Sequence, residues 1–145
     1  MAKANIPKHK TKSVIESYIE QEEYKLQKEH DQYLSFSFKY LDNNEKFPTY
    51  FEDHGYLPTL MQRLIDISTM KRLELIQNNS QSLRCHKILW KDVTEENFGL
   101  KNEDQLVDKP YQFQITANAY GRIHGFFINE VFYIRWLDPN HNLYG

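Results

Sequence analysis

The stretch GRIHGFFINEVFYIRWLDPNHNLYG, residues 121–145, decides the fold. Two runs rich in β-branched and aromatic residues flank Asn129–Glu130, which occupies the place of a two-residue hairpin loop. Asn tolerates the positive φ that such a loop requires. With this loop, Ile128 lies opposite Val131, and every earlier pair follows from that match. The stretch therefore predicts an antiparallel hairpin in which the side chains of each face are known.

The two faces of this predicted hairpin differ in chemistry. One face is wholly apolar and is predicted to meet the core, with Gly125 leaving room for a neighbour; it carries Ile123, Phe127, Phe132, Ile134 and Trp136. The opposite face is predicted to be polar and to gather Arg122, His124, Tyr133 and Arg135, with Phe126 beside Tyr133. Residues directly opposite in such a pair lie about 5 Å apart at Cβ, so these side chains would share one surface.

Outside the hairpin, the sequence predicts three further strands and a pair of helices. The segments 33–41, 82–90 and 111–116 alternate apolar and polar residues, as half-buried strands do. Residues 55–68 instead have a helical repeat, and a shorter helix follows; the two apolar stripes comprise Leu57, Leu60, Met61, Leu64 and Ile65, then Leu73 and Ile76. Short connections among the last strands favour an α+β fold, a curved antiparallel sheet with the helix pair on one face.

The N-terminal part of the chain is predicted to stand apart from this domain. Residues 1–12 are predicted as a flexible basic tail, 13–32 as a helix and 33–145 as a single α+β domain. Ser13 and Glu16 form an S-x-x-E capping box at the start of the helix. Its apolar stripe is thin and its other faces are charged. Such a helix favours docking of a protein partner, here through residues 14–30.

Composition bounds the class of protein. The chain has 145 residues, is 40% apolar and 26% charged, and has a net charge of −2, so it lacks the overall basic signature of a nucleic-acid-binding protein. Its single cysteine, Cys85, permits no internal disulfide and indicates a reducing compartment. No apolar run reaches the roughly 20 residues of a membrane span. We therefore expect a cytoplasmic protein that does not interact with membranes.

The predicted polar face suits phosphate chemistry. Two guanidiniums can clamp a phosphate, and histidine can move a proton near neutral pH. Metal-independent cleavage of RNA needs both, with a group that protonates the leaving oxygen. We assign His124 or His141 as acid or base, Arg122 and Arg135 as clamps, and Tyr144 as a positioning or proton-donating group. The predicted substrate-binding residues are Arg84, His86, Phe126 and Tyr133, the last two by stacking on bases.

Two other interpretations of the same residues stay open. Polar faces of antiparallel sheets often only meet water, and His86 could equally be a hydrogen-bonded, half-buried residue. A metal site built from His86, His124, His141 and Asp138 is disfavoured, because no ligand spacing such as HExxH is present and two arginines would repel a cation. Asp138 fits better as a turn residue before Pro139 that accepts backbone N–H groups. We expect no metal and no cofactor.

The pattern resembles the RelE/HigB/ParE toxin superfamily over about residues 33–145. The similar parts are FSFKYL, LPTLMQRLIDIS, MKRLELIQ and YQFQIT…GRIHGFFINEVFYIRWLDPNHNLY. The resemblance implies a βααβββ core and mRNA cleavage on the ribosome, with Arg122 at the position of the family's strand arginine, Tyr144 at that of its terminal tyrosine, and His141 before it. The chain departs from the pattern in its net acidity, its extra N-terminal helix and an extra strand around His86. Its ending also resembles small proteins of bacterial mobile elements.

Three functions are consistent with these features. The first is a toxin-type endoribonuclease that acts on mRNA and has an antitoxin or another protein partner on residues 14–30. The second is a non-catalytic module that binds nucleic acid or protein. The third is a structural or inhibitory protein of a mobile element. The clustering of proton-transfer side chains favours the first, whereas the net acidity favours the second.

Overall fold

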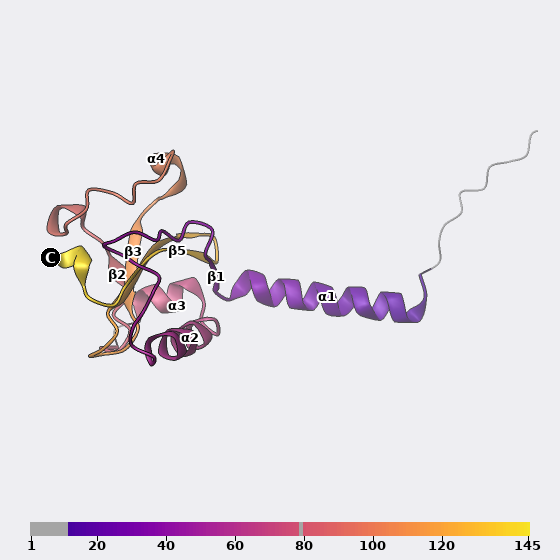
Figure 1. Cartoon of the computed structure of the whole chain (residues 1–145). Helices are drawn as coiled ribbons and strands as arrows, with labels where there is room; N and C mark the ends of the chain where they lie inside the picture. Colours follow the sequence, from indigo (N-terminus) through magenta and orange to yellow (C-terminus); the bar gives the residue numbers. More distant parts are fainter. Residues whose placement is uncertain (1–11, 79) are drawn as a thin grey trace, which may run out of the picture.

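The computed structural model describes residues 12–78 and 80–145 and has a mixed sheet with helices (Figure 1). The helices and strands are α1 (Val14–Gln32), β1 (Ser35–Ser37), α2 (Tyr56–Ile67), α3 (Arg72–Gln77), β2 (His86–Lys87), α4 (Glu103–Leu106), β3 (Pro110–Gln114), β4 (Arg122–Ile128) and β5 (Val131–Asp138). Two 3-10 turns, η1 (Trp90–Asp92) and η2 (Asn142–Tyr144), complete the described elements. Residues 1–11 of the predicted tail lie outside the described residues.

The sheet has five strands in the order β1-β5-β4-β3-β2. The predicted α+β class is confirmed, but the prediction of a purely antiparallel sheet is wrong, because β1 pairs with β5 in parallel. The other pairs, β5–β4, β4–β3 and β3–β2, are antiparallel. A parallel neighbour requires a long crossover, and the segment carrying α2 and α3 supplies it between β1 and the remaining strands.

The helix pair covers one face of the sheet (Figure 1), as predicted, although α2 is rotated relative to the predicted stripe. Its buried residues are Tyr56, Leu60, Leu64 and Ile67. The predicted core residues Leu57, Met61 and Ile65 are instead 57%, 58% and 50% exposed. The large ring of Tyr56 explains the rotation, because it stacks on Phe51 with ring centroids 4.0 Å apart and turns that side of the helix inward.

The other face of the sheet is also buried, which the sequence did not predict. The connections around η1 and α4 and the C-terminal turn η2 cover it, and they enclose a second apolar cluster of Phe47, Ile88, Phe98, Phe126, Trp136 and Leu143. Phe47 stacks on Trp136 with ring centroids 4.5 Å apart. We predicted that this side of the hairpin is polar and faces solvent. That prediction is wrong, because most of this face is buried and packs against the second apolar cluster.

The hairpin register is confirmed near its loop and wrong at its far end. Ile128 pairs with Val131, Phe126 with Tyr133 and Gly125 with Ile134, as predicted. An irregularity between His124 and Gly125 then shifts the register, so that His124 pairs with Trp136 rather than with Arg135. A bulge adds one residue to one strand, and here that residue is Arg135. Trp136 consequently leaves the predicted core face, and Leu137 packs there instead.

The predicted strand over 82–90 is wrong in length. Only His86–Lys87 pairs with β3, because Arg84 has a φ of 43° and turns the backbone before the ladder begins. The alternation also fails beyond Lys87, since Ile88 is buried and Leu89 is 53% exposed. β2 is therefore a short edge strand that brings His86 to the border of the sheet.

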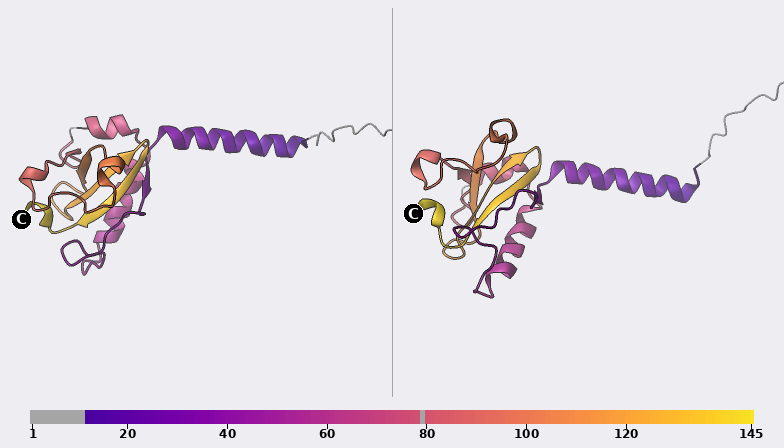
Figure 2. Two further views of the ribbon diagram at one scale, coloured as in Figure 1. Left: turned by 90° about the horizontal axis from the view of Figure 1, so that it is seen from above. Right: turned by 45° about the horizontal axis from the view of Figure 1, so that its top comes forward.

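Helix α1 projects away from the rest of the protein, as Figure 1 and both views of Figure 2 show. The predicted capping box is confirmed: Ser13 Oγ accepts the Glu16 N–H at 3.1 Å, and Glu16 Oε2 accepts the Ser13 N–H at 3.3 Å. Val14 and Ile15 are 88% and 72% exposed. No described helix is both long and apolar enough to cross a membrane.

Candidate functional site

The predicted catalytic histidine His124 is inside the protein. Its exposed fraction is 0%, and its ring lies 6.4 Å from that of Phe47 and 6.3 Å from that of Trp136. The prediction that His124 faces solvent is wrong, because the register shift places Trp136 beside it and Phe47 covers both. A side chain so enclosed cannot touch an RNA substrate, so its role is internal.

The predicted stacking residue Phe126 is also fully buried, at 0% exposed. It stacks on the half-buried Tyr133 with centroids 5.4 Å and planes 10° apart, and both rings lie beside Tyr40. The predicted contact of Phe126 with a base is therefore wrong. This aromatic group belongs to the second apolar cluster.

Arg135 holds two surface segments together rather than facing a substrate. Its Nε donates to the Phe98 carbonyl and its Nη1 to the Tyr40 carbonyl, both at 2.9 Å, and its Nη2 lies 3.5 Å from Asp42 Oδ2. The predicted pairing of Arg135 with Arg122 in one phosphate clamp is wrong. Because of the bulge, the Arg135 side chain reaches the connections that cover this face, and its guanidinium donates hydrogen bonds to their main-chain carbonyls.

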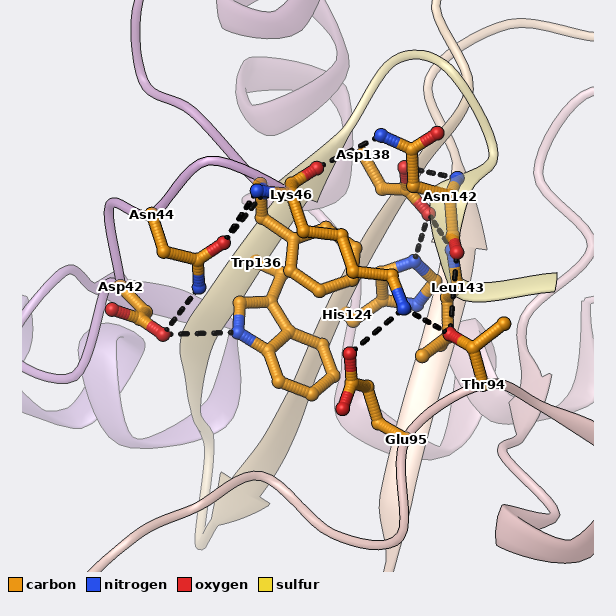
Figure 3. Close-up of polar contacts among 11 residues, drawn as sticks. Asp42, Asn44, Lys46, Thr94, Glu95, His124, Trp136, Asp138, Asn142 and Leu143 are labelled. Atoms are coloured by element: carbon orange, nitrogen blue, oxygen red, sulfur yellow. Dashed lines mark hydrogen bonds and ion pairs between the residues drawn. The ribbon is translucent and has the colours of Figure 1, made fainter. Parts of the chain in front are cut away.

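His124 and Asp138 form a buried pair beneath the C-terminal turn (Figure 3). His124 Nε2 lies 3.1 Å from Asp138 Oδ2. Burial lowers the pKa of His124, although the hydrogen bond to Asp138 opposes this effect. Burial by itself raises the pKa of Asp138, but hydrogen bonds from His124, Leu143 and Asn142 together bring it below its ordinary value. We conclude that the pair consists of a neutral imidazole donating to a carboxylate.

Asp138 fastens the C-terminal turn to the sheet. Its Oδ1 accepts the Asn142 N–H at 2.7 Å and its Oδ2 accepts the Leu143 N–H at 3.0 Å, so the prediction that it accepts backbone N–H groups is confirmed. Leu143 is fully buried, and its carbonyl accepts the Thr94 N–H at 2.7 Å. The carboxylate is satisfied by these donors, and the residue that follows, Tyr144, is held over the sheet.

Four side chains meet beside this turn, and we call them the C-terminal cluster: His86, Gln112, Arg122 and Tyr144. Gln112 pairs with His86 on one neighbouring strand and with His124 on the other, which places these side chains on the same face. Gln112 Nε2 lies 2.9 Å from His86 Nε2 and donates to the Tyr144 hydroxyl. The Arg122 guanidinium carbon lies 4.8 Å from the centre of the Tyr144 ring.

The C-terminal cluster reaches the surface. His86 is exposed and Tyr144 is 39% exposed, whereas Gln112 is fully buried beneath them. His86 Nδ1 lies 3.0 Å from the Lys87 carbonyl, which can accept only if Nδ1 carries the proton. In that tautomer Nε2 presents a lone pair, and it accepts a hydrogen bond from Gln112.

The remaining predicted residues lie around this cluster. Arg84 is exposed at the turn that precedes β2. His141 is exposed at the start of η2, with a φ of 56°, and lies near enough to His124 to lower its pKa. The structure thus brings together Arg122, Tyr144 and His86 from the predicted set, and it separates them from Arg135, Tyr133 and Phe126.

The sequence prediction missed Gln112, which links His86 to Tyr144. Gln112 and Gln114 alternate with apolar residues in β3, a pattern that suggests a solvent-facing side, yet they are 0% and 7% exposed. Their Oε1 atoms have no hydrogen-bond partner within the described residues. Two buried amides on one strand indicate a polar site, because burying an amide is costly unless it forms hydrogen bonds.

The site holds no group of metal ligands. Among residues 12–78 and 80–145, no three His, Cys, Asp or Glu side chains lie close enough to hold a metal ion. Comparison with known proteins finds no matching family model, no matching curated protein and no matching solved structure. What the site can do therefore follows from its own chemistry: an imidazole whose Nε2 lone pair is held by the Gln112 amide, a phenol and a half-buried guanidinium at one place on the surface.

Proposed function

We propose that this protein is a metal-independent endoribonuclease of the RelE-like toxin type that acts on mRNA in the cytoplasm. The observation that carries the proposal is the C-terminal cluster, which joins two proton-transfer groups and one arginine at the surface. The order β1-α2-α3-β2-α4-β3-β4-β5, with β1 parallel to β5, supports it if β2 and α4 are additions to the βααβββ core that the sequence resemblance implies.

The cluster has the groups that RNA cleavage needs. The Gln112 amide releases its hydrogen bond to His86 Nε2, which then takes the proton of the 2′-hydroxyl. The hydroxyl oxygen attacks the phosphorus. Arg122 stabilises the negative charge that grows on the phosphoryl oxygens. Tyr144 donates its proton to the leaving 5′-oxygen as the P–O5′ bond breaks. The products are a 2′,3′-cyclic phosphate and a 5′-hydroxyl end.

The spacing of these groups supports the assignment. His86 Nε2 and the Tyr144 hydroxyl both contact Gln112 Nε2, so they are separated by at most the length of two hydrogen bonds, roughly 6 Å. The attacking and leaving oxygens stand on opposite sides of one phosphorus atom, and a base and an acid a few ångströms apart can serve both. Arg122, against the Tyr144 ring, is beside this gap.

The test is cleavage of a short single-stranded RNA and of ribosome-bound mRNA by the purified protein in excess chelator. We expect 2′,3′-cyclic phosphate ends, and we expect His86→Ala, Arg122→Ala and Tyr144→Phe each to lower the rate by about 10²–10⁴-fold. His54→Ala removes an exposed histidine elsewhere and is the matched control. A wild-type protein that cuts neither RNA rejects the function, and cleavage that survives all three substitutions rejects the site.

Helix α1 favours a second role, the binding of a protein partner such as an antitoxin. Its exposed apolar residues Val14, Ile15, Tyr18 and Ile19 fall on adjoining positions of the first two turns. A partner helix or groove would remove this surface from water. Ile15→Asp with Ile19→Asp should abolish a co-purifying partner, whereas Glu23→Gln should not, and persistence of the complex in the double variant would contradict the assignment.

A further inference from the structure

A cavity of about 660 Å³ lies where three connections meet near the C-terminal end of β5. The segment before α2, the turn between β3 and β4, and the residues after β5 form its wall. Its lining residues include Tyr50, Phe51, Glu52, Asp53, Tyr56 and Tyr120. Neither the proposed catalytic groups nor α1 contributes to it.

Aromatic rings make up much of the wall. Phe51 stacks on Tyr56 with centroids 4.0 Å and planes 30° apart, and Tyr120 meets Tyr56 edge-on at 5.8 Å. Tyr50 is 79% exposed at the rim. Ring faces carry partial negative charge, so a wall of this kind attracts a cation that has shed part of its water.

The acidic side chains of the lining are negatively charged, as the faces of the aromatic rings partly are. Glu52 and Asp53 belong to the wall, and none of the lining residues is a lysine or an arginine. Two carboxylates in a wall without lysine or arginine repel phosphate groups, so this cavity differs in kind from the C-terminal cluster with its arginine. An RNA backbone is therefore excluded as its occupant.

The cavity is built with fixed groups. Asp53 Oδ1 accepts the Gly55 N–H at 2.8 Å and is the acceptor for the Tyr120 hydroxyl at 3.5 Å. A side chain at Gly55 would collide with that hydroxyl, so the glycine allows Tyr120 to lie against the backbone. The Tyr56 hydroxyl is buried and has no hydrogen-bond partner within the described part of the chain. The wall thus has one buried polar group that is unpaired within the described residues.

We propose that this cavity binds an organic cation, a guanidinium or an alkylammonium group. A planar guanidinium fits best, because it can lie against the rings and pair with a carboxylate at its edge. The cation can be a free molecule or the arginine side chain of a partner protein, and the chemistry of recognition is the same for both. The proposal does not depend on the endoribonuclease function.

The test is a titration of the isotope-labelled full chain, followed by NMR, with three probes. Methylguanidinium represents the free cation, Nα-acetyl-arginine methylamide represents an arginine in a protein, and Nα-acetyl-citrulline methylamide is the neutral analogue. We expect saturable shifts at the lining residues with a cationic probe and none with citrulline. Binding of the arginine probe alone assigns a partner side chain, and equal binding of both cations assigns a free molecule.

Variants distinguish binding in this cavity from a general attraction of cations to acidic side chains. Glu52→Gln and Tyr50→Ala change exposed groups of the wall, and each should weaken binding about three- to tenfold. Glu45→Gln removes a carboxylate of the same preceding segment that does not line the cavity, and it should bind like the wild type. Equal shifts with citrulline, no saturation with either cation, or equal loss in Glu45→Gln would each overturn the proposal.

Discussion

The face of the sheet under α2 and α3 and the face under the irregular connections are both buried, yet they hold different side chains. The helix-covered face is apolar, with Phe113, Ile115, Ile123, Phe127, Phe132, Ile134 and Leu137 in its core. All four buried polar residues of the described chain, Gln112, Gln114, His124 and Asp138, lie on the other face.

This difference reflects what covers each face. A helix satisfies its own backbone groups and needs only apolar contact from the sheet. An irregular segment leaves backbone N–H and C=O groups to be satisfied, and the sheet must supply partners for them. Asp138 and Arg135 do so here. The same face can therefore carry polar chemistry at its border, where the C-terminal cluster lies.

The largest expected effect comes from Asp138→Ala. Removal of the carboxylate leaves the His124 imidazole and the Leu143 N–H buried and unpaired and also frees the part-buried Asn142 N–H, which should lower the free energy of unfolding by about 3–5 kcal/mol. Phe132→Ala on the helix-covered face should cost about as much, by leaving a cavity. Urea denaturation measures both.

Hydrogen exchange distinguishes the two variants. At the Leu143 amide, Asp138→Ala should raise exchange far more than the loss of global stability requires, because the turn itself is released. Phe132→Ala should raise exchange only through global unfolding. Equal protection of Leu143 in the two variants would remove the distinction between the faces.

Arg135→Ala should have the next largest effect. It removes two hydrogen bonds from a charged donor to the Phe98 and Tyr40 carbonyls, and we expect a loss of about 2–3 kcal/mol in the free energy of unfolding. Arg84→Ala is the matched control at an exposed site, with an expected change within about 0.5 kcal/mol. Denaturant unfolding of both variants decides, and equal losses would show that Arg135 does not hold the connections.

Below neutral pH, a pH dependence of stability should arise on the face under the irregular connections, where His124 and Asp138 lie. The pKa of folded His124 lies below its unfolded value of about 6.5, so the unfolded state binds the extra proton first. Stability should therefore fall as pH drops below about 6.5, with a slope of at most about 1.4 kcal/mol per pH unit. The depressed pKa of Asp138 adds a further loss only below about pH 4.

His124→Gln should flatten the pH dependence between about pH 6.5 and 5, because it removes the group whose protonation the fold opposes. His54→Gln changes an exposed histidine and should leave the slope as it is. Thermal unfolding of the three proteins over this pH range measures the slopes. An unchanged slope in His124→Gln would assign the dependence to another group.

The smallest effect is expected on the outer side of α2. Met61→Gln and Ile65→Gln replace half-exposed residues and should change the free energy of unfolding by less than about 0.5 kcal/mol. Leu64→Ala, on the buried side of the same helix, should cost about 2–4 kcal/mol. Similar losses at Met61 and Leu64 would show that the outer side is covered as well.

Much of the fold was predictable from local patterns. The capping box of α1, the loop at Asn129–Glu130 and the first pairs of the hairpin depend on neighbouring residues only, and the structure confirms them. The α+β class follows from the alternation of helical and strand periods. The bulge at Arg135 has no comparable signal, because it depends on how Trp136 packs against the distant Phe47.

The candidate site was predictable only in part. Residue chemistry pointed to Arg122, Tyr144 and His86, which the structure brings together, but also to His124 and Arg135, which it buries or uses elsewhere. Whether each of these side chains is exposed or buried decided which of them belong to the candidate site. Exposure depends on the connections that cover the second face, and those connections have no periodic pattern from which to predict their path.

The amino-acid sequence by itself thus determined the local elements, the capping of α1, the hairpin loop and the polar residue types that converge near the C-terminus. Only the tertiary structure decided that both faces of the sheet are buried, that His124 pairs with Asp138 inside, and that His86 meets Tyr144 through Gln112. The physical reason is one of range. Turns, caps and periodicity arise from contacts between near neighbours in the chain, whereas burial is decided by segments that are tens of residues apart.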